Sequence, residues 1–228
     1  MRRLTPLTPA EKKLGWFYWA FQLVLLPVIL TILNTHYGSP LTEMELNLLF
    51  FALNFVLLLL IFHKFIFNSC KTGILRPFRT LRWAIFGFAL YWIYSFAAGW
   101  LILYLDPDFV NANNQHIFDM SQENYALTVL GTVLLAPVAE ELMYRGLIFG
   151  VLYERSKILA YVLSTLLFAM VHVAGYISIY DPKTLLLCLL QYLPAGLCLG
   201  AAYAKTGSIL APVLAHIAIN QVAISTMR

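Results

Sequence analysis

The polar and apolar residues of the chain are arranged in long blocks, in which extended apolar runs are separated by short polar segments. An α-helix rises about 1.5 Å per residue, so about 20 apolar residues cross the hydrocarbon core of a bilayer. The pattern predicts an all-α, polytopic membrane helix bundle of about seven transmembrane helices, within a range of six to eight. We expect the spans at residues 14–33, 45–67, 81–105, 125–153, 158–180, 182–204 and 209–227.

Local signals predict where several helices begin. Residues 8–11 and residues 42–45 each have the Thr-x-x-Glu pattern of a capping box. Asp181 precedes a proline and is expected to cap the sixth span, and Ser121 is expected to cap the fourth. Residues 106–123 read as an acidic loop before that fourth span. The first span is too long for the apolar core of a signal peptide and is interpreted as a retained helix.

Composition strengthens the membrane interpretation. Hydrophobic residues make up 61% of the chain, charged residues 11%, and the mean hydropathy is +0.77, whereas soluble domains carry about 25% charged residues. The net charge of +4 comes from basic residues in short loops, which is not a nucleic-acid signal. The three cysteines are scattered, so neither a disulfide framework nor a zinc knuckle is indicated.

The loop charges predict an orientation in the cell membrane. The N-terminus and alternate loops are basic, which by the positive-inside rule puts the N-terminus in the cytoplasm. Seven spans would leave the C-terminus outside, and one re-entrant helix would reverse that. We expect one integral membrane domain with two parts, an N-terminal three-helix region at 1–124 and a helix core at 125–228.

Three charged residues, Glu140, Glu141 and Arg145, lie inside the predicted span 125–153. A charge near the bilayer centre costs about 2.5–3.5 kcal/mol on insertion scales, so these groups need partners or a function. Glu141 and Arg145 are four residues apart and share a helix face, which is equally consistent with a structural ion pair. Because Arg145 does not readily neutralise two carboxylates, Glu140 is expected to be protonated, hydrated or held by histidines.

Two later spans add His172, and His216 with Asn220. A depth count at 1.5 Å per residue puts Glu140 and His216 in the cytoplasmic half and His172 near the middle, which is compatible with one buried site. Each residue also has a structural interpretation, since histidine and asparagine hydrogen-bond neighbouring helices in membranes. Pro137 can kink its helix, with neighbours satisfying the freed carbonyl.

These residue types suit two kinds of chemistry. A carboxylate and an imidazole can together deprotonate a water, and a second imidazole with an amide can donate hydrogen bonds to an oxyanion. Alternatively, Glu140, His172 and His216 could bind zinc, which accepts mixed nitrogen and oxygen ligands. No serine or cysteine is evidently placed beside a histidine as nucleophile, and the His-Glu-x-x-His zinc helix is absent. The residues alone leave a water-attack peptidase and a metal site open.

Three motifs in order carry a family resemblance. They are Glu-Glu-x-x-x-Arg at 140–145, Phe-x-x-x-His at 168–172 and His-x-x-x-Asn at 216–220, each on its own predicted helix. Together they resemble the CPBP family, the CAAX protease and bacteriocin-processing family also called ABI, in its bacterial form. The resemblance covers roughly residues 125–226.

The resemblance implies an intramembrane glutamic endopeptidase. Glu140 would be the general base, with His172 helping to activate the water, and His216 and Asn220 would form the oxyanion hole. It implies a peptide or membrane-protein substrate, the lipid bilayer as surroundings, and neither a cofactor nor a bound metal.

In the same resemblance, Glu141 and Arg145 would support Glu140 and fix its helix. A non-catalytic membrane partner, such as a bacteriocin immunity protein or a regulator of a sensor kinase, is the alternative function. A proton-coupled carrier using Glu140 is less favoured, because the hydropathy pattern shows no inverted repeat.

Overall fold

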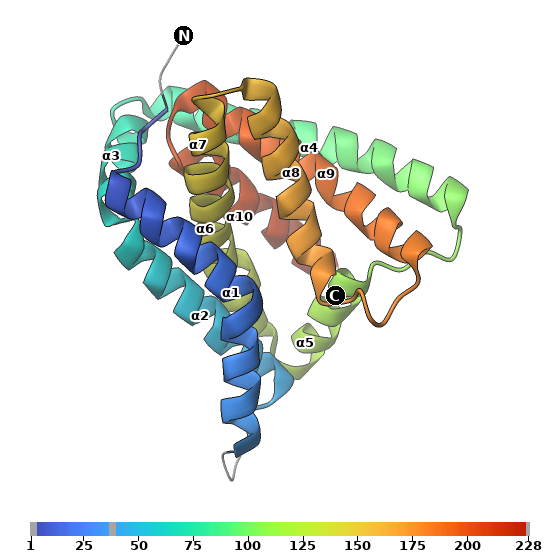
Figure 1. Ribbon diagram of the computed structural model, residues 1–228. Helices are drawn as coiled ribbons and strands as arrows, with labels where there is room; N and C mark the ends of the chain where they lie inside the picture. The colour runs from blue at the N-terminus through green and yellow to red at the C-terminus, as the bar shows by residue number, and fades with distance from the viewer. Residues whose placement is uncertain (1–3, 37–39, 227–228) are drawn as a thin grey trace.

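The computed structural model describes residues 4–36 and 40–226, which form a bundle of helices with no β-strand among them (Figure 1). In chain order the helices are α1 (Pro9–His36), α2 (Glu43–Ile61), α3 (His63–Ile74), α4 (Pro77–Leu105), α5 (Ala112–Val129), η1 (Leu130–Leu135), α6 (Ala136–Glu141), η2 (Leu142–Phe149), α7 (Gly150–Tyr153), α8 (Lys157–Ala174), α9 (Pro182–Thr206) and α10 (Leu210–Ser225). The segments η1 and η2 are π-helical, so α5 to α7 form one continuous helical stretch with a kink at Asn124, which we call the rod.

The described residues contain six helical stretches that are long and apolar enough to cross a membrane, and α10 is a shorter apolar helix. The predicted polytopic all-α membrane bundle is therefore confirmed, within the expected range of six to eight spans. The six stretches are α1, α2, α4, the rod from α5 to α7, α8 and α9.

Two predicted capping boxes are present. The Thr8 backbone N–H donates to Glu11 Oε2 at 2.8 Å, and the Glu11 N–H donates to Thr8 Oγ1 at 3.2 Å. Thr42 and Glu45 make the same reciprocal pair at the start of α2. Asp181 caps α9 as expected, since its Oδ1 accepts from the next backbone N–H groups.

The second predicted span, 45–67, is wrong as a single helix. It breaks at Phe62 (φ −99°, ψ 21°), where α2 ends and the shorter α3 begins. The break is stabilised from another helix, because Oε1 of the buried Glu11 accepts the backbone N–H of Phe65 at 2.7 Å. That bond satisfies a donor in the first turn of α3 that has no partner within its own helix.

The acidic loop predicted at 106–123 is also wrong in most of its length, because α5 begins at Ala112. Ser121 lies inside α5 and does not cap the fourth span, since its hydroxyl donates to the Phe118 carbonyl. The cap is Asn124 instead. This residue has extended dihedrals (φ −152°, ψ 98°) inside the helix, and its Oδ1 accepts from Leu127 N–H at 3.2 Å.

Two predicted span ends also move. The fifth span was expected to reach residue 180, but α8 ends at Ala174 and turns follow it. The seventh ends at Ser225, and its expected end at Met227 lies outside the described residues.

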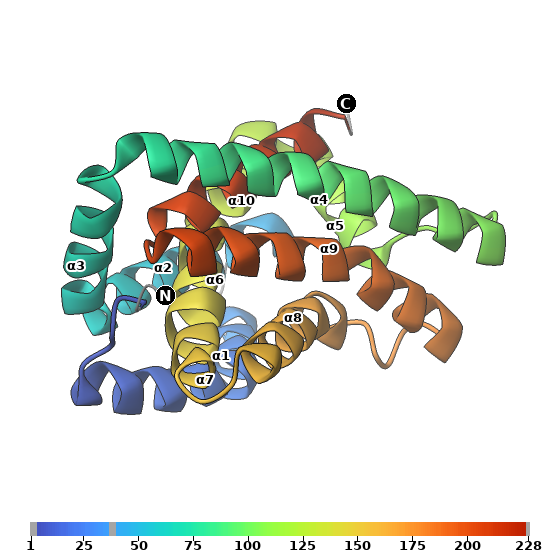
Figure 2. The same ribbon diagram turned by 90° about the horizontal axis from the view of Figure 1, so that it is seen from above.

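The part of the rod from η1 to α7 occupies the middle of the bundle (Figure 1). Its segments contact α1 and α2 on one side and α8 and α10 on the other, as Figures 1 and 2 show. In Figure 2, α4 and α9 lie side by side along much of their length, and these two helices also pack against α10. The charged motif of the sequence is therefore carried by the most enclosed helix of the molecule.

Candidate functional site

The Glu-Glu pair lies at the end of α6, between two π-helical segments. In η1 the hydrogen bonds skip one residue more than in an α-helix, as when the Ala136 N–H donates to the Gly131 carbonyl. Single π-turns are rare in proteins overall, but those that occur are often found at functional sites. The extra residue in such a turn changes which side chains face inward. The sequence pattern gave no signal for either π-helical segment.

One backbone carbonyl in η1 has lost its helical partner. In the π register the carbonyl of Thr132 would accept from residue 137, but that residue is proline and has no N–H. Asn220 Nδ2 donates to this carbonyl at 2.8 Å from α10. The carbonyl freed by Pro137 is thus satisfied by a neighbouring helix, as the sequence suggested.

Glu141 and Arg145 form a fully buried ion pair, with Arg145 Nε 3.1 Å from Glu141 Oε2 and both side chains 0% exposed. Glu141 Oε1 lies 2.9 Å from His216 Nδ1. A carboxylate oxygen accepts, so His216 carries its proton on Nδ1. Arg145 also packs on an aromatic face, with Cζ 4.6 Å from the Phe168 ring centroid. Glu141 therefore orients one motif histidine while Arg145 balances its charge.

Glu140 is in a different environment from its neighbour. Its side chain is 24% exposed, and Oε2 lies 3.8 Å from His172 Nε2 and 3.8 Å from His216 Nε2. Oε2 is buried and has no hydrogen-bond partner among the described residues. Buried polar atoms without a partner are exceptions that call for an explanation, such as a functional role or a bound water.

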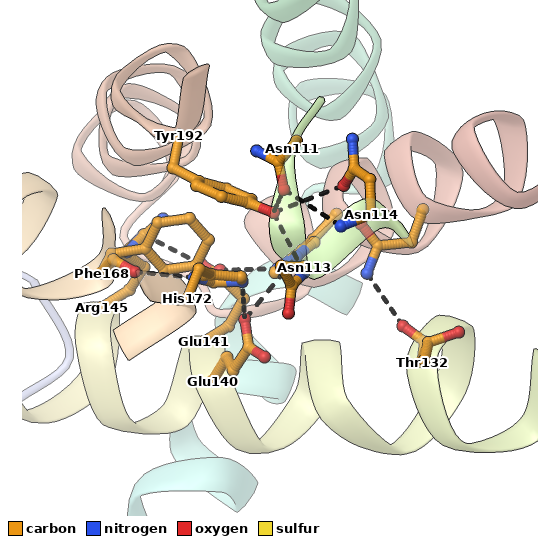
Figure 3. A network of polar contacts seen from close by, with 12 residues as sticks. Asn111, Asn113, Asn114, Thr132, Glu140, Glu141, Arg145, Phe168, His172 and Tyr192 are labelled. Carbon is orange, nitrogen blue, oxygen red and sulfur yellow. Dashed lines mark hydrogen bonds and ion pairs between the residues drawn. The ribbon is translucent and has the colours of Figure 1, made fainter. Parts of the chain in front are cut away.

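The orientation of His172 follows from its backbone bond. Nδ1 lies 2.8 Å from the Phe168 carbonyl, which can only accept, so the proton is on Nδ1 and the Nε2 lone pair faces Glu140. His172 can therefore receive a proton at Nε2. The structure thus brings five of the six predicted residues, from three separate parts of the fold, into one largely buried cluster, as Figure 3 shows for those labelled there. The five are Glu140, Glu141, Arg145, His172 and His216.

A cavity of ≈ 110 Å³ adjoins this cluster. Two of the predicted residues, His172 and Asn220, line it, together with polar side chains from α5 and α9. We call it the inner cavity. Its remaining lining residues are Tyr91, Asn113, Asn114, Ile117, Thr132, Gln191, Tyr192, Ala195, Ile219, Ala223 and Ile224.

The inner cavity contains a polar network that sequence reasoning missed in part. The Tyr192 ring stacks on His172, with centroids 4.3 Å apart and planes at 23°. Its hydroxyl accepts from Asn113 Nδ2 at 3.0 Å and lies 3.3 Å from Asn111 Oδ1 and 3.4 Å from Asn114 Oδ1 (Figure 3). The asparagines lie in the segment 106–123, which was expected to be a loop. The Asn-x-Asn-Asn cluster was the available signal.

The zinc alternative would use Glu140, His172 and His216. Among residues 4–36 and 40–226, no group of three or more His, Cys, Asp or Glu side chains has an arrangement suited to a metal ion. The question is decided by chelation, in the experiment described below.

The fold and the cluster define a multi-pass membrane protein. Comparison with known proteins shows which family the chain resembles. Residues 122–222 match the family model described as type II CAAX prenyl endopeptidase Rce1-like. The resemblance to the CAAX protease family is therefore confirmed for this segment of the chain. It contains all three motifs.

A curated relative is the "Putative membrane peptidase YdiL" of Bacillus subtilis (strain 168). It is 31% identical over 143 residues, which cover 62% of this chain and 54% of the relative. The matched region thus spans about half the length of the relative. No solved structure matches the chain.

Proposed function

We propose that the protein is an intramembrane endopeptidase that hydrolyses a peptide bond in a peptide or membrane-protein substrate, with water as the nucleophile. The observation that carries the proposal is the position of Glu140, whose Oε2 lies 3.8 Å from the Nε2 atoms of both His172 and His216. A water that reaches Glu140 and the free Nε2 of His172 meets two proton acceptors at once. The family match and the relative's name support peptidase activity.

The groups present account for each proton transfer in the proposed hydrolysis. Water attacks the scissile carbonyl carbon, and its proton passes to Glu140, assisted by His172. The oxyanion formed accepts from the second N–H of Asn220, since the first is bonded to Thr132. It also accepts from His216 Nε2, which requires a second proton on that ring, because Nδ1–H is bonded to Glu141. The proton held by Glu140 then passes to the leaving amine.

Charge balance supports this distribution of protons. An ionised Glu140 and an ionised Glu141 face one arginine, so a doubly protonated His216 makes the cluster neutral. A buried cluster without net charge avoids the cost of an uncompensated ion. Glu141 and Arg145 act in this proposal as positioning residues for His216 and the α6 segment.

The test uses purified full-length protein in detergent and a library of quenched fluorescent peptides. Glu140→Gln and His172→Ala are expected to lower kcat/KM by about 10²- to 10⁴-fold, the usual range for general acid–base groups. Glu154→Gln is the matched control, because this exposed glutamate only pairs with Lys12 at 3.3 Å and should cleave like the wild type. Cleavage unaffected by a chelator supports the glutamate–water mechanism, whereas loss that zinc restores would replace it with a metallopeptidase.

The alternative is a non-catalytic membrane partner, such as a bacteriocin immunity protein or a regulator of a sensor kinase. Glu140→Gln in cells separates the two, since a non-catalytic partner would keep its biological effect in this variant. We also propose that the N-terminus is cytoplasmic, which the basic alternate loops support.

A further inference from the structure

The inner cavity lies next to a second, larger hollow. This outer hollow measures ≈ 650 Å³ and is lined by residues of α4, α5, α9 and the segment between α4 and α5, together with Thr226. Two residues, Asn114 of α5 and Gln191 of α9, line both spaces. They lie between the outer hollow and the inner cavity, which His172 also lines, and we call these two residues the neck.

The neck and cavity walls carry amide groups that are only half satisfied. Asn114 Oδ1 lies 3.4 Å from the Tyr192 hydroxyl, and Gln191 Oε1 accepts from Asn111 at 2.8 Å. The opposite amide end of Asn114 and of Gln191 has no hydrogen-bond partner among residues 4–36 and 40–226. Neither end is among the sealed, unpaired polar atoms of the described chain, so both are within reach of a water.

Two further amides in the inner cavity repeat this arrangement. Asn113 uses Nδ2 for Tyr192, and Asn220 uses Nδ2 for the Thr132 carbonyl, while Oδ1 of each has no partner in the described part of the chain. Unpaired polar groups inside a membrane protein are costly unless they border a water-filled space. A buried water typically makes two to four hydrogen bonds, and four amide ends around one small cavity meet that requirement.

We propose that the inner cavity is a water chamber that supplies the hydrolytic water to His172 and Glu140, filled from the outer hollow through the Asn114–Gln191 neck. A volume of ≈ 110 Å³ holds about three or four waters at roughly 30 Å³ each. The use of this water in catalysis rests on the proposed function, but its presence does not. Tyr192 forms part of the wall, with one face on the His172 ring and the hydroxyl among the asparagines (Figure 3).

The presence of water is measured without reference to activity. Full-length protein in detergent is exposed to a short X-ray pulse in H₂¹⁸O, and oxidation of tyrosine and phenylalanine side chains is read by mass spectrometry. Radiolysis labels a side chain where a water molecule sits beside it. Tyr192 reports on the chamber and Phe109 on the outer hollow. Tyr203 sets the background, because it is 0% exposed and lines neither space.

We expect Tyr192 to be labelled well above Tyr203, both in the wild type and in Glu140→Gln. Asn114→Leu removes the neck amide at nearly constant size, and should lower Tyr192 labelling to the Tyr203 background while Phe109 labelling stays unchanged. Asn114→Gln keeps an amide and should keep the label. Tyr192 labelling equal to that of Tyr203 in the wild type would overturn the chamber, and this comparison needs no variant to fold.

Cleavage assays then test whether the chamber supplies the hydrolytic water. In Asn114→Leu we expect kcat to fall about tenfold or more with little change in KM, because the variant affects the reacting water and not substrate binding. Lost labelling with unchanged kcat would overturn the supply role. If the wild type cleaves nothing while Tyr192 is labelled, the proposed function fails and the chamber stands. If the wild type cleaves peptides but Tyr192 is not labelled, the chamber is overturned and the proposed function stands.

Discussion

Glu11 and Glu140 are two acidic residues of one membrane helix bundle, and they are treated in opposite ways. Glu11 is 3% exposed, and its two oxygens accept from Phe65 N–H at 2.7 Å and from Thr8 N–H and Oγ1 at 2.8 Å each. Glu140 is 24% exposed at the side chain, and its buried Oε2 has no hydrogen-bond partner among the described residues. A saturated carboxylate stabilises a fold, whereas an unsatisfied one is available to react.

The helices that carry and surround the two carboxylates also differ in how deeply they are buried. In an apolar 18-residue stretch of each of the candidate spans α1, α2 and α4, only 17%, 17% and 11% of residues are buried. In the corresponding 18-residue stretches of the rod from α5 to α7, of α8 and of α9 the shares are 56%, 33% and 50%. The first group therefore mainly presents side chains to the surface of the bundle. We propose that residues 1–124 are a mainly lipid-facing frame, whose α5 also lines the inner cavity, and that residues 125–228 are the reactive core.

The largest expected effect on stability comes from Arg145→Met. The variant leaves Glu141 fully buried with His216 as its remaining partner, and breaking one side of a buried ion pair costs about 3–5 kcal/mol. We expect a lower midpoint of thermal unfolding in detergent. Glu141→Gln in the same chain removes the orphaned charge and should recover most of that loss. An Arg145→Met protein as stable as the wild type would contradict the assignment of this pair as the electrostatic support of the core.

Glu11→Gln tests the saturated carboxylate. An amide has one acceptor oxygen, so it cannot serve both Phe65 and Thr8, and the free energy of unfolding should fall by about 1–3 kcal/mol. Cleavage at temperatures where the variant is folded should match the wild type. Glu45→Gln is the control, because Glu45 has the same capping-box position but is exposed. An equal loss in both variants would mean that the bond to α3 contributes nothing.

Helix starts with side-chain caps were predictable, because the cap and its partner are close in sequence, as with Thr42 and Glu45. The break at Phe62 was not predictable, since an apolar run continues through it and the group that stabilises it, Glu11, is 54 residues away from Phe65. Ser121 had the right residue type for a cap, but Asn124 occupies that role three residues later.

The candidate site was predictable in its motif residues, because charges and histidines are rare inside apolar spans. The hydrogen-bond partner of each residue was not predictable, since it depends on how each helix is rotated about its axis. Glu141, not Glu140, hydrogen-bonds His216, and the π-helical segments on either side of the pair have no sequence signature. The asparagines around Tyr192 were expected in a loop, because a run of polar residues does not distinguish a loop from a helix that faces a cavity.

The smallest expected effect separates two roles of Asn220. Asn220→Leu removes the donor to the Thr132 carbonyl, which Pro137 cannot replace. In a Pro137→Ala background residue 137 has an N–H that can bond this carbonyl in the π register. We therefore expect Asn220→Leu to cost less in that background, with a coupling free energy of about 1 kcal/mol in a double-mutant cycle read by unfolding.

The same four proteins also report on catalysis. If the second N–H of Asn220 stabilises the oxyanion, cleavage is lost in Asn220→Leu in both backgrounds, although stability is regained in one. Activity that returned together with stability would reduce Asn220 to the hydrogen-bond partner of a broken helix. Additive unfolding energies would show that the Thr132 carbonyl does not depend on either residue. In that case the contrast between satisfied and reactive polar groups would rest on Glu11 and Glu140 alone.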